Sequence, residues 1–128
     1  MPGPARSGVL IYAFDLDRLS VFYARLLAAA VLYEDADHQL LQSPDTQLIV
    51  HAIPAPYRDV IQIQTPPEPR EEQAIKPFFS VADLAEAERL AVELGGLVLG
   101  PVWPGPGMKL RNVCDPEGNI VQLREFTA

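Results

Sequence analysis

The sequence is short of the residues and segments that several common classes of protein need. A single cysteine, Cys114, excludes an intramolecular disulfide. No apolar run approaches the roughly 20 residues that are needed to span a bilayer. Residues 1–7 also lack the long apolar core of a signal peptide. We therefore expect a soluble, cytoplasmic protein that has no membrane partner.

Positive charge is scarce as well. The chain has 10 Lys and Arg against 17 Asp and Glu, which gives a formal net charge of −7. The basic residues are scattered and form no stripe or arm, so the release of counterions from a phosphate backbone cannot drive binding. These features exclude nucleic acid as an expected partner. The acidic excess is interpreted as a contribution to solubility.

What is present is a pattern of short strands and helices in 128 residues, 48% of them hydrophobic. Residues 8–14 are β-branched and aromatic and predict a buried strand. A helix with an apolar stripe follows, with Asp15 or Asp17 as its N-cap. Three short antiparallel strands separated by turns then fit the segment up to about residue 53. Residues 54–75 contain five prolines and predict a linker across the surface, with residues 60–64 extended inside it.

The pattern then starts again. Residues 76–81 predict a strand, and residues 83–96 predict a helix that ends at Gly95-Gly96. Residues 97–103 form the next expected strand, and Pro104–Gly107 is predicted to be a loop. Two further strands, 108–114 and 119–126, are expected to join at the turn Asp115-Pro116-Glu117-Gly118.

The two halves can be superposed as repeats. Asp15-Leu16 matches Asp83-Leu84 with an offset of 68, and the turn that starts at Ser43 matches the turn that starts at Asp115 with an offset of 72. The longer Pro/Gly segment of the second half accounts for the difference. The chain is therefore predicted to be a tandem repeat of strand–helix–strand–strand–strand that forms one domain over residues 1–128, with modules at about 8–53 and 76–126.

Two stretches carry a resemblance to a known family. "DLDRLSVFYARLL" in the first half and "DPEGNIVQLRE" in the second resemble the glyoxalase/bleomycin-resistance/extradiol-dioxygenase family, the vicinal oxygen chelate superfamily, from Gly8 to Phe126. The resemblance implies an α+β fold in which tandem βαβββ modules form a curled mixed sheet around a cleft, usually in a homodimer. Members include metal-dependent lyases, isomerases, dioxygenases and thiol transferases, and also metal-free proteins that bind a drug. The fold therefore does not determine the function.

In metal-using relatives the ligands come from the first and last strands of each module. The corresponding positions here are Gly8, Lys76, Gln122 and Val50, the last assigned by the offset of 72. Glycine and valine offer no donor atom, lysine is a cation, and a neutral amide is a weak ligand. The resemblance therefore predicts no metal and no other cofactor at these positions.

Other residues could hold a metal only from different positions. His51 neighbours Val50, so strand alternation is expected to turn it toward the helix layer or a dimer edge. His38 is interpreted as a surface residue in a turn. Glu125 is three residues beyond Gln122 and is expected to point away from the cleft. A metal site with displaced ligands such as His51 and Glu125 stays open as an alternative.

The same alternation predicts which residues line the cleft. The first strand of each module contributes Gly8, Leu10 and Tyr12, and Lys76, Phe78 and Ser80; the last strands contribute Leu48, Val50 and Ala52, and Ile120, Gln122 and Arg124. Trp103 is either a lid or an aromatic that caps the core. Lys76 and Arg124 favour an anionic or electron-rich ligand if they reach the cleft, and otherwise their charges lie at the rim in water. Cys114 is expected to be an inert thiol.

These observations predict a metal-independent protein that binds a small apolar, aromatic or anionic molecule and sequesters a drug or metabolite. The predicted ligand-binding residues are Tyr12, Val50, Lys76, Phe78, Ser80, Trp103, Gln122 and Arg124, and no catalytic residue is assigned. The alternative is a divalent-metal-dependent lyase or dioxygenase with displaced ligands. Two further hypotheses are a metal-free enzyme in which Lys76 or Tyr12 transfers a proton, and a scaffold that only mediates association.

Overall fold

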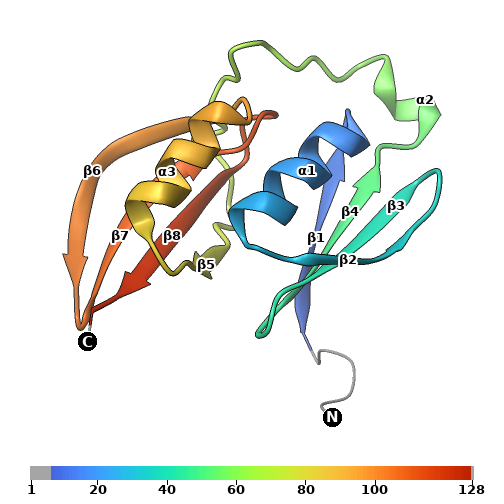
Figure 1. The fold of residues 1–128 in the computed structure, drawn as a ribbon. Helices are drawn as coiled ribbons and strands as arrows, with labels where there is room; N and C mark the ends of the chain where they lie inside the picture. The colour runs from blue at the N-terminus through green and yellow to red at the C-terminus, as the bar shows by residue number, and fades with distance from the viewer. Residues whose placement is uncertain (1–6, 128) are drawn as a thin grey trace. The chain divides into compact units, whose positions relative to one another are not determined.

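The computed structural model describes residues 7–127, which divide into two compact units between Gln62 and Ile63. The boundary falls inside the predicted linker. We call the described residues up to Gln62 module one and those from Ile63 module two. Each consists of a four-stranded sheet with a helix packed on one face (Figure 1).

Module one contains the expected sequence of elements. These are β1 (Gly8–Ala13), α1 (Leu16–Leu26), β2 (Ala30–Glu34), β3 (His38–Gln42) and β4 (Gln47–Ala52). The strand order is β1-β4-β3-β2, with β1 parallel to β4 and the other pairs antiparallel. This order places the first and last strands of the module side by side in the sheet. A short helix, α2 (Ala55–Arg58), follows in the segment that the sequence predicts to be a linker.

Helix α1 begins where its acidic cap allows. The carboxylate of Asp15 accepts a hydrogen bond from the backbone N–H of Arg18 at 3.1 Å, so Asp15 rather than Asp17 is the N-cap. The buried side chains of the helix recur at helical spacing and pack on the sheet: Leu19, Ser20, Phe22, Tyr23 and Leu26. Ala28, just after the helix, has a φ of 49°, in the left-handed region where a helix usually ends on glycine.

Module two repeats the plan. Its elements are β5 (Phe78–Ser80), α3 (Leu84–Glu93), β6 (Leu97–Gly105), β7 (Met108–Cys114) and β8 (Ile120–Phe126). The order β5-β8-β7-β6 has the same parallel and antiparallel pairs as the first sheet. Asp83 caps α3 through the N–H of Glu86, and Gly95 ends it with a φ of 96°. The tandem βαβββ repeat of an α+β fold is thus confirmed, and within the described residues no helix is long and apolar enough to cross a membrane.

One predicted boundary was wrong, and the linker shows two further features. Strand β6 continues through Pro104 to Gly105, because it is an edge strand and a proline there costs no hydrogen bond inside the sheet. Residues 60–64 form no strand. The later part of the linker is also tied to the turn between β7 and β8: Arg70 N–H donates to the Gly118 carbonyl at 2.9 Å, and the Gln73 side chain bonds both backbone groups of Ile120 at 2.8 Å.

When the two modules are aligned on their turns, the residues of their last strands are shifted by one position. Ser43 N–H donates to the carbonyl of Thr46, three residues on, whereas Asp115 N–H donates to the carbonyl of Asn119, four residues on. The second turn is therefore one residue longer. Leu10 and Phe78, each five residues before an N-cap, pair with Ile49 and Gln122. The structural counterpart of Gln122 is consequently Ile49 and not the predicted Val50.

Candidate functional site

In module two the face of the sheet opposite α3 is the open face. Phe78 pairs with Gln122 and Ser80 with Arg124, so these four predicted residues share one face. The alternate residues Phe79, Val121 and Leu123 are buried and form the core. The predicted orientation of β5 and β8 is therefore confirmed, while ligand binding by these residues stays a prediction.

Three side chains on this face form a connected group that we call the Arg124 cluster: Phe78, Gln122 and Arg124. The guanidinium carbon of Arg124 lies 3.8 Å from the centre of the Phe78 ring, a cation–π contact. Arg124 Nε–H donates to Gln122 Oε1 at 2.8 Å. The guanidinium is thus oriented by two neighbours, and its charge is held over an apolar ring instead of extending into water.

The cross-strand partners of Gln122 and Arg124 continue this face toward the edge of the sheet. Arg124 pairs with Leu110, which pairs with Trp103, so Trp103 is on the open face with 54% of its surface exposed. Gln122 pairs with Asn112, whose Oδ1 is buried and has no hydrogen-bond partner among the described residues. Sequence reasoning did not select Asn112. The predicted Lys76 lies before β5 and is exposed.

In module one the open face differs from the prediction. Val50 and Leu48 are buried and alternate along β4 with His51, the residue that pairs with Tyr12, so the prediction that Val50 shares a face with Tyr12 was wrong. Tyr12 pairs with His51, and their ring centres are 5.3 Å apart. His51 in turn pairs with His38 on β3, with ring centres 4.2 Å apart. His51 therefore lies on the open face instead of the helix layer, and the reason is the one-residue difference between the two turns.

The two imidazoles are oriented by acceptors behind them. His38 Nδ1 lies 3.0 Å from Asp35 Oδ1, and His51 Nδ1 lies 2.6 Å from its neighbouring carbonyl oxygen at Ala52. Asp35 also accepts from the N–H of Asp37 and of His38, each at 2.8 Å, and from the hydroxyl of Tyr33 at 2.9 Å. These bonds, that of Asp37 first, hold the pKa of the Asp35 carboxyl well below its usual range. The hydrogen bond to the Asp35 carboxylate in turn raises the pKa of Tyr33.

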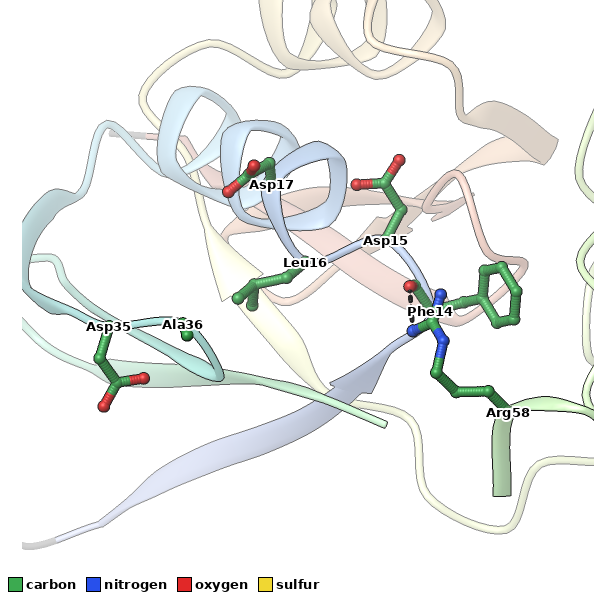
Figure 2. A pocket seen from close by; sticks show the side chains of 7 residues that line it. All are labelled: Phe14, Asp15, Leu16, Asp17, Asp35, Ala36 and Arg58. Atoms are coloured by element: carbon green, nitrogen blue, oxygen red, sulfur yellow. Dashed lines mark hydrogen bonds between the residues drawn. The ribbon is translucent and has the colours of Figure 1, made fainter. Parts of the chain in front are cut away.

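A pocket of about 500 Å³ lies at the start of α1, and Asp35 is one of the residues that line it (Figure 2). Asp15 and Asp17 line it from the helix, and Arg58 lines it from α2. Arg58 donates to the Phe14 carbonyl at 2.6 Å and lies 4.0 Å from the centre of the Phe14 ring. Asp15 is the helix cap, and Asp17 accepts from Gln39 at 3.3 Å. These polar groups stabilise the local fold, and sequence reasoning did not anticipate the pocket.

The positions that the resemblance assigns to metal ligands carry few donor atoms here. With the corrected register they are Gly8, Ile49, Lys76 and Gln122, a set with one weak neutral donor and one cation. Glu125 binds the start of α3 instead, because its Oε1 accepts a hydrogen bond from the N–H of Leu84 at 2.7 Å. Across residues 7–127 no group of three or more His, Cys, Asp or Glu side chains could hold a metal ion. The predicted direction of Glu125, away from the open face, is confirmed.

The remaining candidates from the sequence have structural roles. Cys114 is fully buried, and burial raises the pKa of its thiol. Asp115 is also fully buried and accepts from the N–H groups of Glu117 and Asn119, at 2.8 and 3.1 Å. The carboxylate thus holds the turn together, as expected of a turn residue. Cys114, with its protonated and inaccessible thiol, is a poor nucleophile.

Two four-stranded mixed sheets, each with a helix on one face, and an open face with aromatic and polar side chains define a protein of the glyoxalase/bleomycin-resistance fold. The family model described as "Glyoxalase-like domain" matches residues 8–124, so the chain belongs to that family. The chain is similar to the bleomycin-binding protein solved in complex with bleomycin (21% identity, TM-score 0.61, covering 95% of this chain and 98% of that chain).

Two other solved structures are similar. One is a glyoxalase/bleomycin resistance protein/dioxygenase family enzyme from Burkholderia phytofirmans (13% identity, TM-score 0.70, covering 96% and 99% of the two chains). The other is the fosfomycin resistance protein FosX from Mesorhizobium loti (14% identity, TM-score 0.66, covering 94% and 91%). A comparison with curated proteins gives no match. At these identities the structural likeness shows the fold alone, and a fold does not determine the function.

Proposed function

We propose that this chain binds a small aromatic or anionic molecule on the open face of module two, without a metal ion, and sequesters it unchanged. The Arg124 cluster carries the proposal: a cation held against the Phe78 ring and hydrogen-bonded to Gln122, on the same face of the sheet as the exposed Trp103 two strands away. Apolar and aromatic surface with a few placed polar groups is typical of a small-molecule site. The bleomycin-binding relative supports the class of function.

The charge of the cluster determines the expected ligand. Arg124 is a cation in a chain of net charge −7, so it attracts an anionic group that the rest of the molecule repels. Because the guanidinium is planar, it can donate to a carboxylate or sulfonate through two N–H groups at once. Phe78 and Trp103 supply the surfaces for an aromatic ring. An aromatic acid therefore matches the cluster better than a neutral sugar or a cation.

The proposal is tested by binding of three probes: salicylate, 1-anilinonaphthalene-8-sulfonate and metal-free bleomycin. Each is titrated into the chain with and without EDTA, and the unfolding midpoint is followed, because a ligand of the folded state raises it in a concentration-dependent way. We expect saturable binding of at least one probe, unchanged by EDTA, and recovery of the probe at its original mass. No saturable binding of any probe, or binding lost in EDTA, would contradict the proposal.

Variants localise the site. Arg124→Ala removes a charged donor, a loss of about 1.5–3 kcal/mol, or roughly 10- to 100-fold in affinity. Trp103→Ala is expected to weaken an aromatic probe by about tenfold through lost stacking. Arg89→Ala is the matched control: it removes the same charge from α3, where Arg89 pairs with Glu86 and Glu93 away from the open face. Equal losses for Arg124→Ala and Arg89→Ala would indicate only a general effect of charge.

The predicted homodimer belongs to this proposal, because the resemblance implies it. Sedimentation of the untagged chain measures it directly. The alternative from the sequence was a metal-dependent lyase or dioxygenase with ligands such as His51 and Glu125. The carboxylate of Glu125 instead accepts a hydrogen bond from the first residue of α3.

A further inference from the structure

The chain has two histidines, His38 on β3 and His51 on β4, and they lie directly opposite each other in the sheet. The next pair along the strands, Asp37 and Ala52, is joined by a hydrogen bond from Ala52 N–H to the Asp37 carbonyl at 2.8 Å. Hydrogen-bonded and non-hydrogen-bonded pairs alternate in an antiparallel ladder. His38 and His51 therefore form a non-hydrogen-bonded pair, whose side chains approach each other most closely.

The hydrogen bonds of the two rings determine where their protons are. A carbonyl oxygen only accepts, so His51 Nδ1, 2.6 Å from the Ala52 oxygen, carries its proton. The ionised Asp35 carboxylate also only accepts, so His38 Nδ1 carries its proton as well. In each neutral ring the lone pair is then on Nε2. Histidines that bind metals show this arrangement, with the other ring nitrogen donating to a carboxylate or a backbone carbonyl.

The spacing of the rings fits one shared ion. With metal–nitrogen bonds of about 2.0 Å, two imidazoles at right angles around an ion have ring centres about 4.4 Å apart, and at the tetrahedral angle about 5.1 Å. The observed separation is 4.2 Å, with 71° between the ring planes. The separation is close to the value for ligands at right angles, as in square-planar and octahedral sites, and shorter than the tetrahedral value. Among first-row divalent ions, nitrogen ligands bind Cu²⁺ most tightly.

We propose that His38 and His51 chelate one divalent transition-metal ion through their Nε2 atoms, with Cu²⁺ preferred and the other coordination positions left to water or an exogenous ligand. The site is distinct from the positions of metal-using relatives: His38 is on β3, which supplies none of those ligands, and His51 is two residues beyond Ile49 on β4. Asp35 is a positioning residue that orients the His38 ring. The proposal does not depend on the organic ligand of module two.

The test uses Cu²⁺ alone, titrated as its glycine complex into the full chain after removal of any affinity tag, with no organic probe present. We expect one Cu²⁺ per chain and an electron paramagnetic resonance spectrum with two imidazole nitrogens. His38→Gln and His51→Gln should each lower the affinity at least tenfold, and Asp35→Asn about tenfold. Gln42→Ala is the control, because it changes the same open face of β3 and removes no imidazole.

The outcomes separate a chelate from two independent ligands. If each single variant halves the number of bound ions and leaves their affinity unchanged, the histidines bind separately and the proposal is wrong. Unchanged binding in either variant also overturns it, since the ion is then held elsewhere. Proton spectra of the unsubstituted chain add a readout that needs no variant: sub-stoichiometric Cu²⁺ should broaden the ring signals of both histidines together, and broadening of only one contradicts a shared ion.

Discussion

The two modules share one backbone plan and differ in the chemistry of their open faces. Both sheets have the same strand order, and both helices start at an aspartate that caps the third N–H after it. Module one presents two imidazoles beside Tyr12, whereas module two presents the Arg124 cluster. Because the core faces are needed for packing within each module, the open faces are where the two modules can differ in function.

The largest expected effect tests whether this shared plan makes one domain. Leu48 in module one and Leu123 in module two are almost fully buried. Leu48→Ala and Leu123→Ala should each cost about 2–5 kcal/mol of the free energy of unfolding. If the modules form one domain, each variant shifts a single unfolding transition seen by calorimetry. A variant that shifts one of two transitions would show two domains and contradict the prediction of a single one.

The longer turn of module two gives the next largest effect. Gly118 has a φ of 88°, and a Cβ at this position would clash with the carbonyl oxygen of Glu68. Gly118→Ala should destabilise the chain by about 2 kcal/mol or more in chemical denaturation, because strain and the clash add. Asp45→Ala in the shorter, exposed turn of module one is the comparison, and we expect a smaller loss. Equal losses would contradict the special role of the longer turn.

Helix α3 of module two has a second acceptor at its start, Glu125, in addition to its N-cap Asp83. Its carboxylate accepts from the N–H of Leu84 at 2.7 Å. Glu125→Ala leaves this N–H without its acceptor and should cost about 1 kcal/mol, while Glu125→Gln keeps an acceptor and should cost less. Urea denaturation measures both. If the two variants lose the same stability, the carboxylate is not acting as a cap.

The ends of the two helices give the smallest effect. Ala28 and Gly95 both have positive φ, of 49° and 96°. Ala28→Gly should stabilise the chain by about 0.5 kcal/mol, because the relief of left-handed strain exceeds the entropy lost by glycine. Gly95→Ala should destabilise it by about 1 kcal/mol. Thermal unfolding of both variants tests the pair, and stabilisation by Gly95→Ala would contradict the assignment.

The fold could be predicted from the sequence because its signals are local. Aspartate caps, Gly95-Gly96 and the D-P-E-G turn each act within a few residues, and they repeat. The open face of module two was also predictable, since β8 follows directly from that turn and alternation then selects Gln122 and Arg124. The family resemblance supplied what these local patterns lack, namely how strands distant in sequence pair.

The open face of module one was not predicted because alternation transmits a one-residue error to every side chain of a strand. Matching the two turns at Ser43 and Asp115 introduced that error. It assigned Val50 to the open face and His51 to the face that the helix covers. A signal was available: His38 is six residues before Pro44, and His51 is six residues after Asp45. A hairpin centred on Pro44-Asp45 places them opposite each other. Asn112 and the pocket beside Asp35 depend on tertiary packing, for which the sequence holds no such signal.

The most direct test of the functional account is the affinity for 1-anilinonaphthalene-8-sulfonate, measured by fluorescence titration with and without EDTA. We expect the same Kd in both conditions, a Kd at least tenfold higher for Arg124→Ala, and an unchanged Kd for Arg89→Ala. That result would assign an anionic aromatic ligand to the open face of module two without a metal. A Kd that rises in EDTA, or that Arg124→Ala leaves unchanged, would contradict it.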